Sequence, residues 1–306
     1  MSAPGKKPPS GLIGAGLLIV DKPAGLTSHD VVARCRKLFK TRRVGHAGTL
    51  DPMATGVLVL GIERATKLLG LLALTTKSYT ATIRLGQSTT TDDAEGEASG
   101  GAPAHEIAEE DWRAEIAKLT GSISQVPSTV SAIKIDGQRA HKRVRDGEEV
   151  VIPARDVMVD RFEVLGTRVV GEYLDLDVEV DCSSGTYIRA LARDIGAALG
   201  VGGHLTVLRR TRVGPFGLDG ARTLDELAEH AEVNLPIDEA VRTAFPLRDI
   251  SADEAEAISQ GRWLETVGIK GVYGVVDPGG NVIALLKEEG RRAASVLVVR
   301  PATLRD

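Results

Sequence analysis

The segment from Gly45 to Leu58, GHAGTLDPMATGVL, constrains the fold most, because it should form a tight loop around one carboxylate, Asp51. Pro52 pushes the residue before it away from helical backbone angles. The glycines of the segment leave room for a bulky group or permit unusual backbone angles. We therefore expect Asp51 at a loop tip, where it can act as a nucleophile. The alternative is an ordinary Asp-Pro turn that leads into an apolar strand.

Length and composition favour a globular protein of more than one domain. A chain of 306 residues exceeds the usual size of a single hydrophobic core. Hydrophobic residues make up 42% and charged residues 26%, and no apolar run approaches the roughly 20 residues that a membrane helix needs. We therefore predict a cytoplasmic protein without membrane contact, in which residues 1–14 form a disordered basic arm.

The cysteines and histidines give no sign of a metal site. Cys35 and Cys182 are the only cysteines of the chain, and neither stands in the spacing of zinc ligands, so two free thiols are expected. The six histidines are scattered too widely to form a recognisable metal motif. We predict neither a metal ion nor a cofactor.

The charge pattern favours a polyanion as partner. The formal net charge of −4 argues against a nucleic acid at first, because phosphate contacts usually need a local excess of Lys and Arg. Basic residues nevertheless gather in three clusters, at 34–43, 134–145 and 209–212, whereas acidic residues gather elsewhere. Each cluster alone is typical of solvated charge on a helix face, but three together favour a basic surface for a polyanion.

Hydrophobic periodicity predicts both helices and strands. Helical spacing is present at 28–40, where Ser28 is the expected N-cap, and at 109–120 and 187–199. Alternation of apolar and polar residues predicts strands at 78–86 and 174–182. Because the two kinds of element do not alternate as strict βαβ units, we expect an α+β fold with an antiparallel or mixed sheet.

The last 60 residues have a pattern of their own. A short helix is expected at 252–261, and strands at 272–276, 282–286 and 295–299. The sequence DPGGN between the first two strands is typical of a hairpin turn. These elements predict a small, β-rich, barrel-like unit.

Five stretches of the chain together resemble one family. They are residues 17–32, 45–58, 77–97, 125–140 and 182–196, and they are similar in order and spacing to the motifs of bacterial tRNA pseudouridine synthases of the TruB type. The resemblance implies a catalytic domain at 15–247, with a thumb-like RNA-binding insertion at about 125–150. It also implies a PUA-like C-terminal domain at 248–306, for which a stabilising appendage is the alternative.

The resemblance also implies an activity and roles for single residues. The activity is isomerisation of uridine to pseudouridine in the T-loop of tRNA, at position 55, by base flipping and without a cofactor. The catalytic residues would be Asp51, Tyr79 and Arg189, with Arg189 paired to Asp51. The substrate-binding residues would be Lys22, His46, Tyr187 and Leu208, together with Lys134, Arg139 and Arg143 as phosphate contacts of the thumb.

Two other functions compete with this one. The first is the guide-RNA-dependent catalytic subunit of the same superfamily, which works with accessory proteins. The second is an RNA-binding protein or RNA chaperone, either with vestigial catalytic residues or beside the enzymatic role. We expect a monomer without an obligate protein partner. The sequence leaves open whether the aspartate attacks uracil or ribose, and which group transfers the proton.

Overall fold

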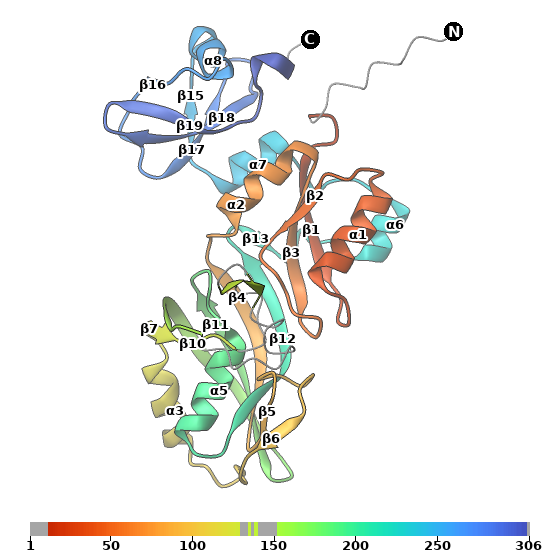
Figure 1. Ribbon diagram of the computed structural model, residues 1–306, viewed down its shortest axis with the longest axis vertical. Coiled ribbons are helices and arrows are strands. Elements are labelled where there is room, and N and C mark those ends of the chain that lie inside the picture. The colour runs from red at the N-terminus through yellow and green to blue at the C-terminus, as the bar shows by residue number, and fades with distance from the viewer. Residues whose placement is uncertain (1–11, 129–133, 136–137, 140–151, 305–306) are drawn as a thin grey trace.

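The structure is a computed structural model that describes residues 12–128, 134–135, 138–139 and 152–304. Its main part is a ten-stranded sheet with helices against it, and a second, five-stranded sheet follows towards the C-terminus (Figure 1). The large sheet is mixed, because one strand pair within it is parallel and the others are antiparallel. The predicted α+β fold with a mixed sheet and a β-rich C-terminal unit is confirmed.

The large sheet has the strand order β14-β1-β3-β12-β4-β11-β10-β7, with β2 on β3 and β13 on β12. Its strands are β1 (Gly16–Lys22), β2 (Val44–Ala47), β3 (Thr55–Ile62), β4 (Lys77–Leu85), β7 (Gly121–Gln125), β10 (Arg155–Val170), β11 (Tyr173–Cys182), β12 (Gly203–Val213), β13 (Phe216–Gly217) and β14 (Leu235–Pro236). The late strand β12 lies between the early strands β3 and β4. It runs parallel to β3 and antiparallel to β4, so it joins distant parts of the chain.

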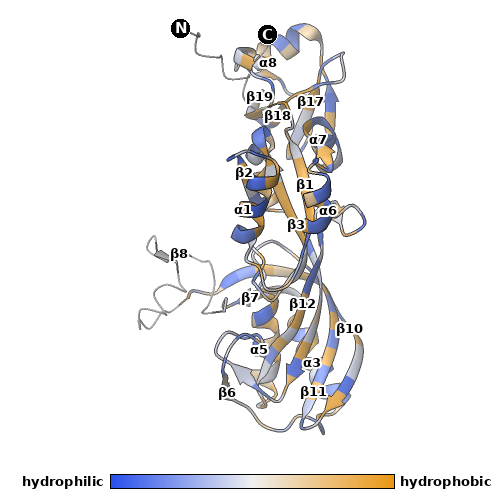
Figure 2. Cartoon of the chain, turned by 90° about the vertical axis from the view of Figure 1, so that its right-hand side faces the viewer, coloured by the Kyte–Doolittle hydropathy of each residue, from blue (hydrophilic) through white to orange (hydrophobic). Residues whose placement is uncertain are grey.

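Helices cover this sheet, and the described residues also form two small two-stranded hairpins. The helices are α1 (Ser28–Leu38), the 3-10 helix η1 (Glu63–Leu68), α2 (Leu69–Leu72), α3 (Glu109–Lys118), α5 (Ile188–Ala198), α6 (Leu224–Glu229) and α7 (Ile237–Ala244). The hairpins are β5 (Ser88–Thr89) with β6 (Ala98–Gly100) and β8 (Lys134–Ile135) with β9 (Gln138–Arg139). Hydrophobic residues lie along β1 and β3, whereas α1 is largely hydrophilic (Figure 2). Its exposed side chains include Arg34, Arg36 and Lys37, so the outer face of this helix is basic.

The predicted N-cap of α1 is wrong by one residue. Thr27, not Ser28, has the extended backbone of an N-cap, and its side chain accepts the N–H of Asp30. The Asp30 carboxylate in turn accepts the Thr27 N–H at 2.9 Å, which completes a capping box. Ser28 is buried instead, because its hydroxyl is used in a contact with a distant loop. The helix ends at Leu38, and Lys40 beyond it adopts a left-handed φ of 51°.

The C-terminal unit contains the five-stranded sheet in the order β15-β17-β18-β19-β16. Its elements are β15 (Leu247–Asp249), α8 (Ala252–Ser259), β16 (Leu264–Glu265), β17 (Val272–Val276), β18 (Val282–Glu289), β19 (Arg292–Val298) and the 3-10 helix η2 (Ala302–Leu304). The predicted helix, three strands and hairpin turn are all present. The third strand begins earlier than predicted, at Arg292.

The two sheets share a hydrophobic core at helix α7. Val241 of α7, Val59 of β3 and Leu285 of β18 belong to the same buried cluster. Polar contacts reinforce this junction, because Arg300 makes two hydrogen bonds to the Asp238 carboxylate, at 2.6 and 2.7 Å. The C-terminal sheet is therefore packed on the large sheet through α7.

Candidate active site

Asp51 lies in the loop that joins β2 to β3, as predicted. The loop is tied to the N-terminal part of the chain from two sides. The Ser28 hydroxyl accepts the N–H of Leu50 at 2.8 Å and donates to its carbonyl at 3.1 Å. The N–H of Gly25 donates to the Pro52 carbonyl at 2.8 Å. These contacts flank Asp51 and fix its backbone.

Lys22 supports the same loop. It is fully buried at the end of β1, and its ammonium donates to the carbonyls of Pro23 at 2.9 Å, Leu26 at 2.6 Å and Pro52 at 3.2 Å. Burial lowers the pKa of Lys22 to about 8, an effect that the nearby Asp51 charge opposes. Lys22 thus lies behind the loop and does not line the cavity that opens beside Asp51.

Arg189 joins Asp51 to a second carboxylate. It is the second residue of α5 and is buried. Its Nε lies 3.0 Å from Asp51 Oδ2, and its Nη1 lies 3.5 Å from Asp93 Oδ2. Nη1 also donates to the Thr91 carbonyl at 2.7 Å. One guanidinium therefore stands between two carboxylates and fixes the orientation of the Asp51 side chain.

Asp93 is part of this network although the sequence did not single it out. It is 2% exposed, and its Oδ1 accepts the Thr91 hydroxyl at 2.5 Å and the Glu95 N–H at 3.1 Å. Both donors belong to the same turn as Asp93, so these bonds orient its carboxylate independently of Arg189. Its place in the stretch TTTDDAEGE, inside one of the five motifs, was the available signal.

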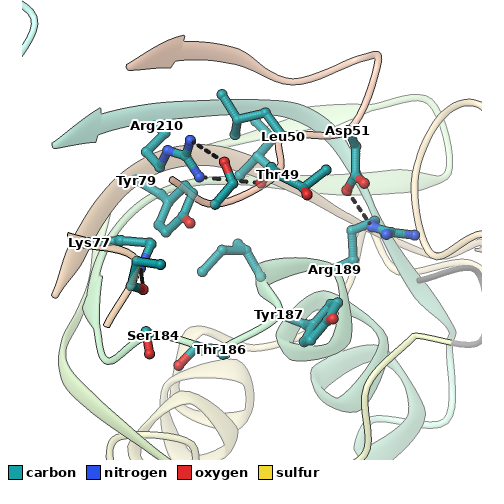
Figure 3. A pocket seen from close by; sticks show the side chains of 15 residues that line it. Thr49, Leu50, Asp51, Lys77, Tyr79, Ser184, Thr186, Tyr187, Arg189 and Arg210 are labelled. Atoms are coloured by element: carbon teal, nitrogen blue, oxygen red, sulfur yellow. Dashed lines mark hydrogen bonds and ion pairs between the residues drawn. The ribbon is translucent and has the colours of Figure 1, made fainter. Parts of the chain in front are cut away.

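A cavity of about 270 Å³ opens beside Asp51 (Figure 3). Asp51 and residues 48–50 line it from the loop, and Lys77 and Tyr79 line it from β4. Residues 184–187 line it from the β11–α5 connection, residues 188–189 from the start of α5, and Leu208 and Arg210 from β12. The sheet register explains this meeting, because Arg210 is paired with Gly56 of β3 on one side and with Tyr79 of β4 on the other. The predicted Asp51, Tyr79, Tyr187, Arg189 and Leu208 thus lie around one cavity.

The close packing of the strands under the cavity requires a glycine at position 56. Its φ is +100°, and a Cβ atom there would lie 2.1 Å from the carbonyl oxygen of Arg210. No side chain fits at that distance. Gly56 therefore lets β3 and β12 approach closely just below Asp51.

The comparisons with known proteins identify the family. The family described as TruB family pseudouridylate synthase, N terminal domain, matches residues 36–188. Two C-terminal families, tRNA pseudouridylate synthase B C-terminal domain and tRNA Pseudouridine synthase II, C terminal, match residues 189–248 and 245–300. The tRNA pseudouridine synthase B of Rhodococcus jostii (strain RHA1) is 69% identical over 301 residues, which are 98% of this chain and 99% of that protein. The chain belongs to the TruB family.

Other relatives and solved structures agree with this family assignment. The tRNA pseudouridine synthase B of Nocardia farcinica is 66% identical over 291 residues, covering 95% of each protein. Among solved structures, a chain of a Cbf5-Nop10-Gar1 complex matches with a TM-score of 0.73 and 28% identity, over 96% of this chain and 87% of that one. A chain of an archaeal box H/ACA sRNP Nop10-Cbf5 complex gives 0.70 and 26%, over 96% and 88%. This TruB-type protein is thus a pseudouridine synthase, which is an isomerase.

The charge states of the TruB-type site follow from burial. Burial raises the pKa of Asp51 above its ordinary 3.8, and the Asp93 charge adds to this effect, whereas Arg189 opposes it. Burial also raises the pKa of Tyr79 above 10.0, so its phenol is neutral near pH 7. The carboxyl group of Asp51, which Arg189 contacts, and the neutral phenol of Tyr79 thus share the cavity.

His46 lies on β2, outside the cavity wall. Its ring contacts that of His29 edge to face, with centroids 5.5 Å apart. Burial lowers its pKa below 6.5, and the neighbouring His29 acts in the same direction. Its Nδ1 is buried and has no hydrogen-bond partner within the described residues. His46 is therefore a neutral imidazole beside the loop and is not a lining residue of the cavity.

The predicted phosphate contacts are only partly described. The backbones of Lys134 and Arg139 are paired in the β8–β9 hairpin. Arg143 lies outside the described residues, as does most of the predicted thumb. The third basic cluster is not a continuous surface patch. Arg210 is 1% exposed, and Arg209 forms two hydrogen bonds to Asp21 at 3.0 and 2.7 Å. The reason is strand geometry, because neighbouring residues of β12 point to opposite faces.

The described residues give three further findings. None of their helices is long and apolar enough to cross a membrane. No group of three or more His, Cys, Asp or Glu side chains among them is placed to hold a metal ion. Cys35 and Cys182 are buried free thiols, and burial raises the pKa of each to about 11.

Proposed function

We propose that this chain isomerises uridine to pseudouridine at position 55, in the T-loop of tRNA. The observation that carries the proposal is the ion pair of Asp51 with the buried Arg189 at the edge of a base-sized cavity. The substrate follows from the relatives, which are named tRNA pseudouridine synthase B and match over nearly the whole chain. The reaction would take place in the cytoplasm, in a monomer without a cofactor.

The chemistry needs one carboxylate and a closed environment for the base. The bond between C1′ and N1 breaks, the uracil turns, and C1′ bonds to C5, while C5 loses its proton and N1 gains one. An ionised Asp51 serves either as a nucleophile or as a stabiliser of positive charge at C1′. The target base leaves its stack to reach this site. Tyr79, Tyr187 and Leu208 then supply the apolar surface that holds the flipped ring.

The remaining predicted residues act around this centre. Lys22 supports the loop of Asp51, and His46 helps to hold the T-loop of the RNA open. Phosphate contacts by Lys134, Arg139 and Arg143 position the RNA without reading bases. We propose that residues 15–247 form the catalytic unit, with the thumb-like insertion at about 125–150. Residues 248–306 form a PUA-like unit that binds RNA or stabilises the catalytic unit.

A guide-RNA-dependent subunit is less well supported, although the Cbf5 structures share the fold. The identity is 28% to the first of those structures, against 69% over 98% of this chain to the Rhodococcus jostii relative. Whether this chain depends on accessory proteins can be tested directly. The purified chain alone should modify a tRNA transcript without a guide RNA. An additional RNA-chaperone role needs no chemistry and should persist in an inactive variant.

The deciding experiment measures tritium release from an unmodified tRNA transcript labelled at uracil C5. Wild type should release tritium, and Asp51→Asn should not, although its folding and RNA binding are retained. Asp111→Asn, at an exposed position in the first turn of α3, is the matched control and should be fully active. A transcript with cytidine at position 55 should release none. Equal release by wild type and Asp51→Asn would refute the catalytic role, and no release by wild type would refute the activity.

A further inference from the structure

Two buried cations flank Tyr79 in the wall of the cavity, because Lys77 precedes it by two residues on β4 and Arg210 is paired with it on β12. Lys77 is 6% exposed and Arg210 is 1% exposed, and both side chains line the cavity (Figure 3). With Arg189, they bring the lining cations to three, against the single carboxylate of Asp51. Among its lining residues, the cavity therefore has an excess of positive charge.

Neither cation has an acidic partner among the salt bridges of the described residues. The Lys77 ammonium donates to the carbonyls of Ala73 and Thr75, at 3.0 Å each. The Arg210 guanidinium donates to the carbonyls of Val57 at 2.8 Å, Gly48 at 3.1 Å and Thr49 at 3.3 Å. Carbonyl groups solvate these charges but do not neutralise them.

Such an arrangement opposes folding and therefore needs another explanation. Two like charges buried side by side repel each other, and each also loses its hydration. The effect is visible at Lys77, because burial and the neighbouring Arg210 lower its pKa to about 8. Unfavourable charge placed in a cavity wall is a common sign of function.

The proposed reaction supplies a use for this positive charge. When the bond between N1 and C1′ breaks, its electron pair stays on the uracil ring and its carbonyl oxygens. If Asp51 adds to the ring instead, negative charge develops on a ring carbonyl. Fixed cations in a water-poor cavity stabilise such charge strongly, because they need not reorganise during the reaction. The cationic wall therefore suits both possible mechanisms.

An ammonium has three N–H donors, and the described residues give Lys77 two acceptors, Ala73 and Thr75. We propose, on the basis of the proposed function, that Lys77 is a further catalytic residue. Its third N–H donates to a carbonyl oxygen of the flipped uracil and stabilises the negative charge that forms on the ring. The competing explanation is purely structural, in which Lys77 only closes the turn after α2.

Charge-removing and charge-keeping variants separate these explanations. Lys77→Met should lower the single-turnover rate constant at saturating tRNA by about 100-fold or more, as for the loss of one donor to a developing anion. The Kd for tRNA should stay within about threefold, because the contact matters mainly in the transition state. Lys77→Arg should recover part of the rate. Lys118→Met, which removes an exposed lysine at the end of α3, should behave as wild type.

Several outcomes would overturn the proposal. A folded Lys77→Met variant with a rate constant within about threefold of wild type would refute it. The proposal would also be refuted if Lys77→Met lost only thermal stability and Lys77→Arg did not restore that stability. Tritium release by wild type in the same assay tests the proposed function independently of the role of Lys77. The proposed function fails only if wild type is inactive.

A second measurement needs no stable variant. A T-arm stem-loop with 5-nitrouridine at the target position carries a ring that ionises near neutral pH. Its affinity for wild type should rise by about tenfold or more as the ring becomes anionic, relative to the uridine stem-loop at the same pH. Weaker binding of the ionised ring would contradict a cationic wall. Where Lys77→Met folds, most of this preference should disappear.

Discussion

Replacing Arg189 with Met should slow the reaction and change its pH dependence. The Arg189 guanidinium lies 3.0 Å from Asp51 and 3.5 Å from Asp93. A hydrogen bond to a charged group contributes about 1.5–3 kcal/mol, which corresponds to roughly 10- to 150-fold in rate. The Asp51 side chain is 33% exposed, so water replaces part of the lost contact. We therefore expect a loss in the lower half of that range, roughly 10- to 40-fold.

The pH dependence supplies a second, independent readout. The active form of Asp51 is the carboxylate, so the rate should fall as pH decreases through its pKa in the folded protein. That pKa is raised above 3.8, chiefly by burial, and Arg189 opposes the rise. Without Arg189, the pKa must increase further, because the Asp93 charge is no longer balanced. The acid limb of the rate profile should therefore move to higher pH in Arg189→Met.

The assay is single-turnover tritium release at saturating tRNA, between about pH 5 and pH 9. The matched control is Arg193→Met, one turn further along α5, where the guanidinium pairs with Asp92 and Asp194. That variant should keep the wild-type acid limb. An Arg189→Met profile that coincides with wild type at both its plateau and its acid limb would refute the role of the ion pair.

Three further predictions follow from the structure. Asp93→Asn should lower the single-turnover rate by roughly 10-fold with unchanged tRNA affinity, because a neutral amide orients Arg189 less strongly; a larger effect on Kd than on rate would contradict this. Gly56→Ala should destabilise the fold by at least about 2 kcal/mol in urea unfolding, whereas Gly70→Ala, where a Cβ meets open space, should not. Cys35 and Cys182, with pKa values raised to about 11, should resist iodoacetamide at pH 8 in the folded protein and react after unfolding, as mass spectrometry would show.

Much of the site was predictable from sequence because its residues stand in local motifs. Local sequence patterns predict the loop of Asp51, the strand of Tyr79 and the start of the helix that contains Arg189. The same patterns do not show which charged side chains are buried. Arg210 lies in the polar run from Arg209 to Arg212, and Lys77 begins the strand of Tyr79. Only the sheet order shows that both face a cavity. Thr and Ser are both favoured N-cap types, with Ser slightly ahead, and the contact of Ser28 with the loop at Leu50 leaves the cap to Thr27.

The position of β12 also has a consequence for how this protein is made. During synthesis, β3 and β4 leave the ribosome long before residues 203–213, which lie between them in the finished sheet. Until then, each of these strands has an open edge that can pair with another chain. Pairing across so long a stretch of chain is slow. A nascent chain that stops before β12 can therefore contain Asp51 and Tyr79 but lacks the cavity between them. Enzymatic activity then appears only after β12 has joined the sheet.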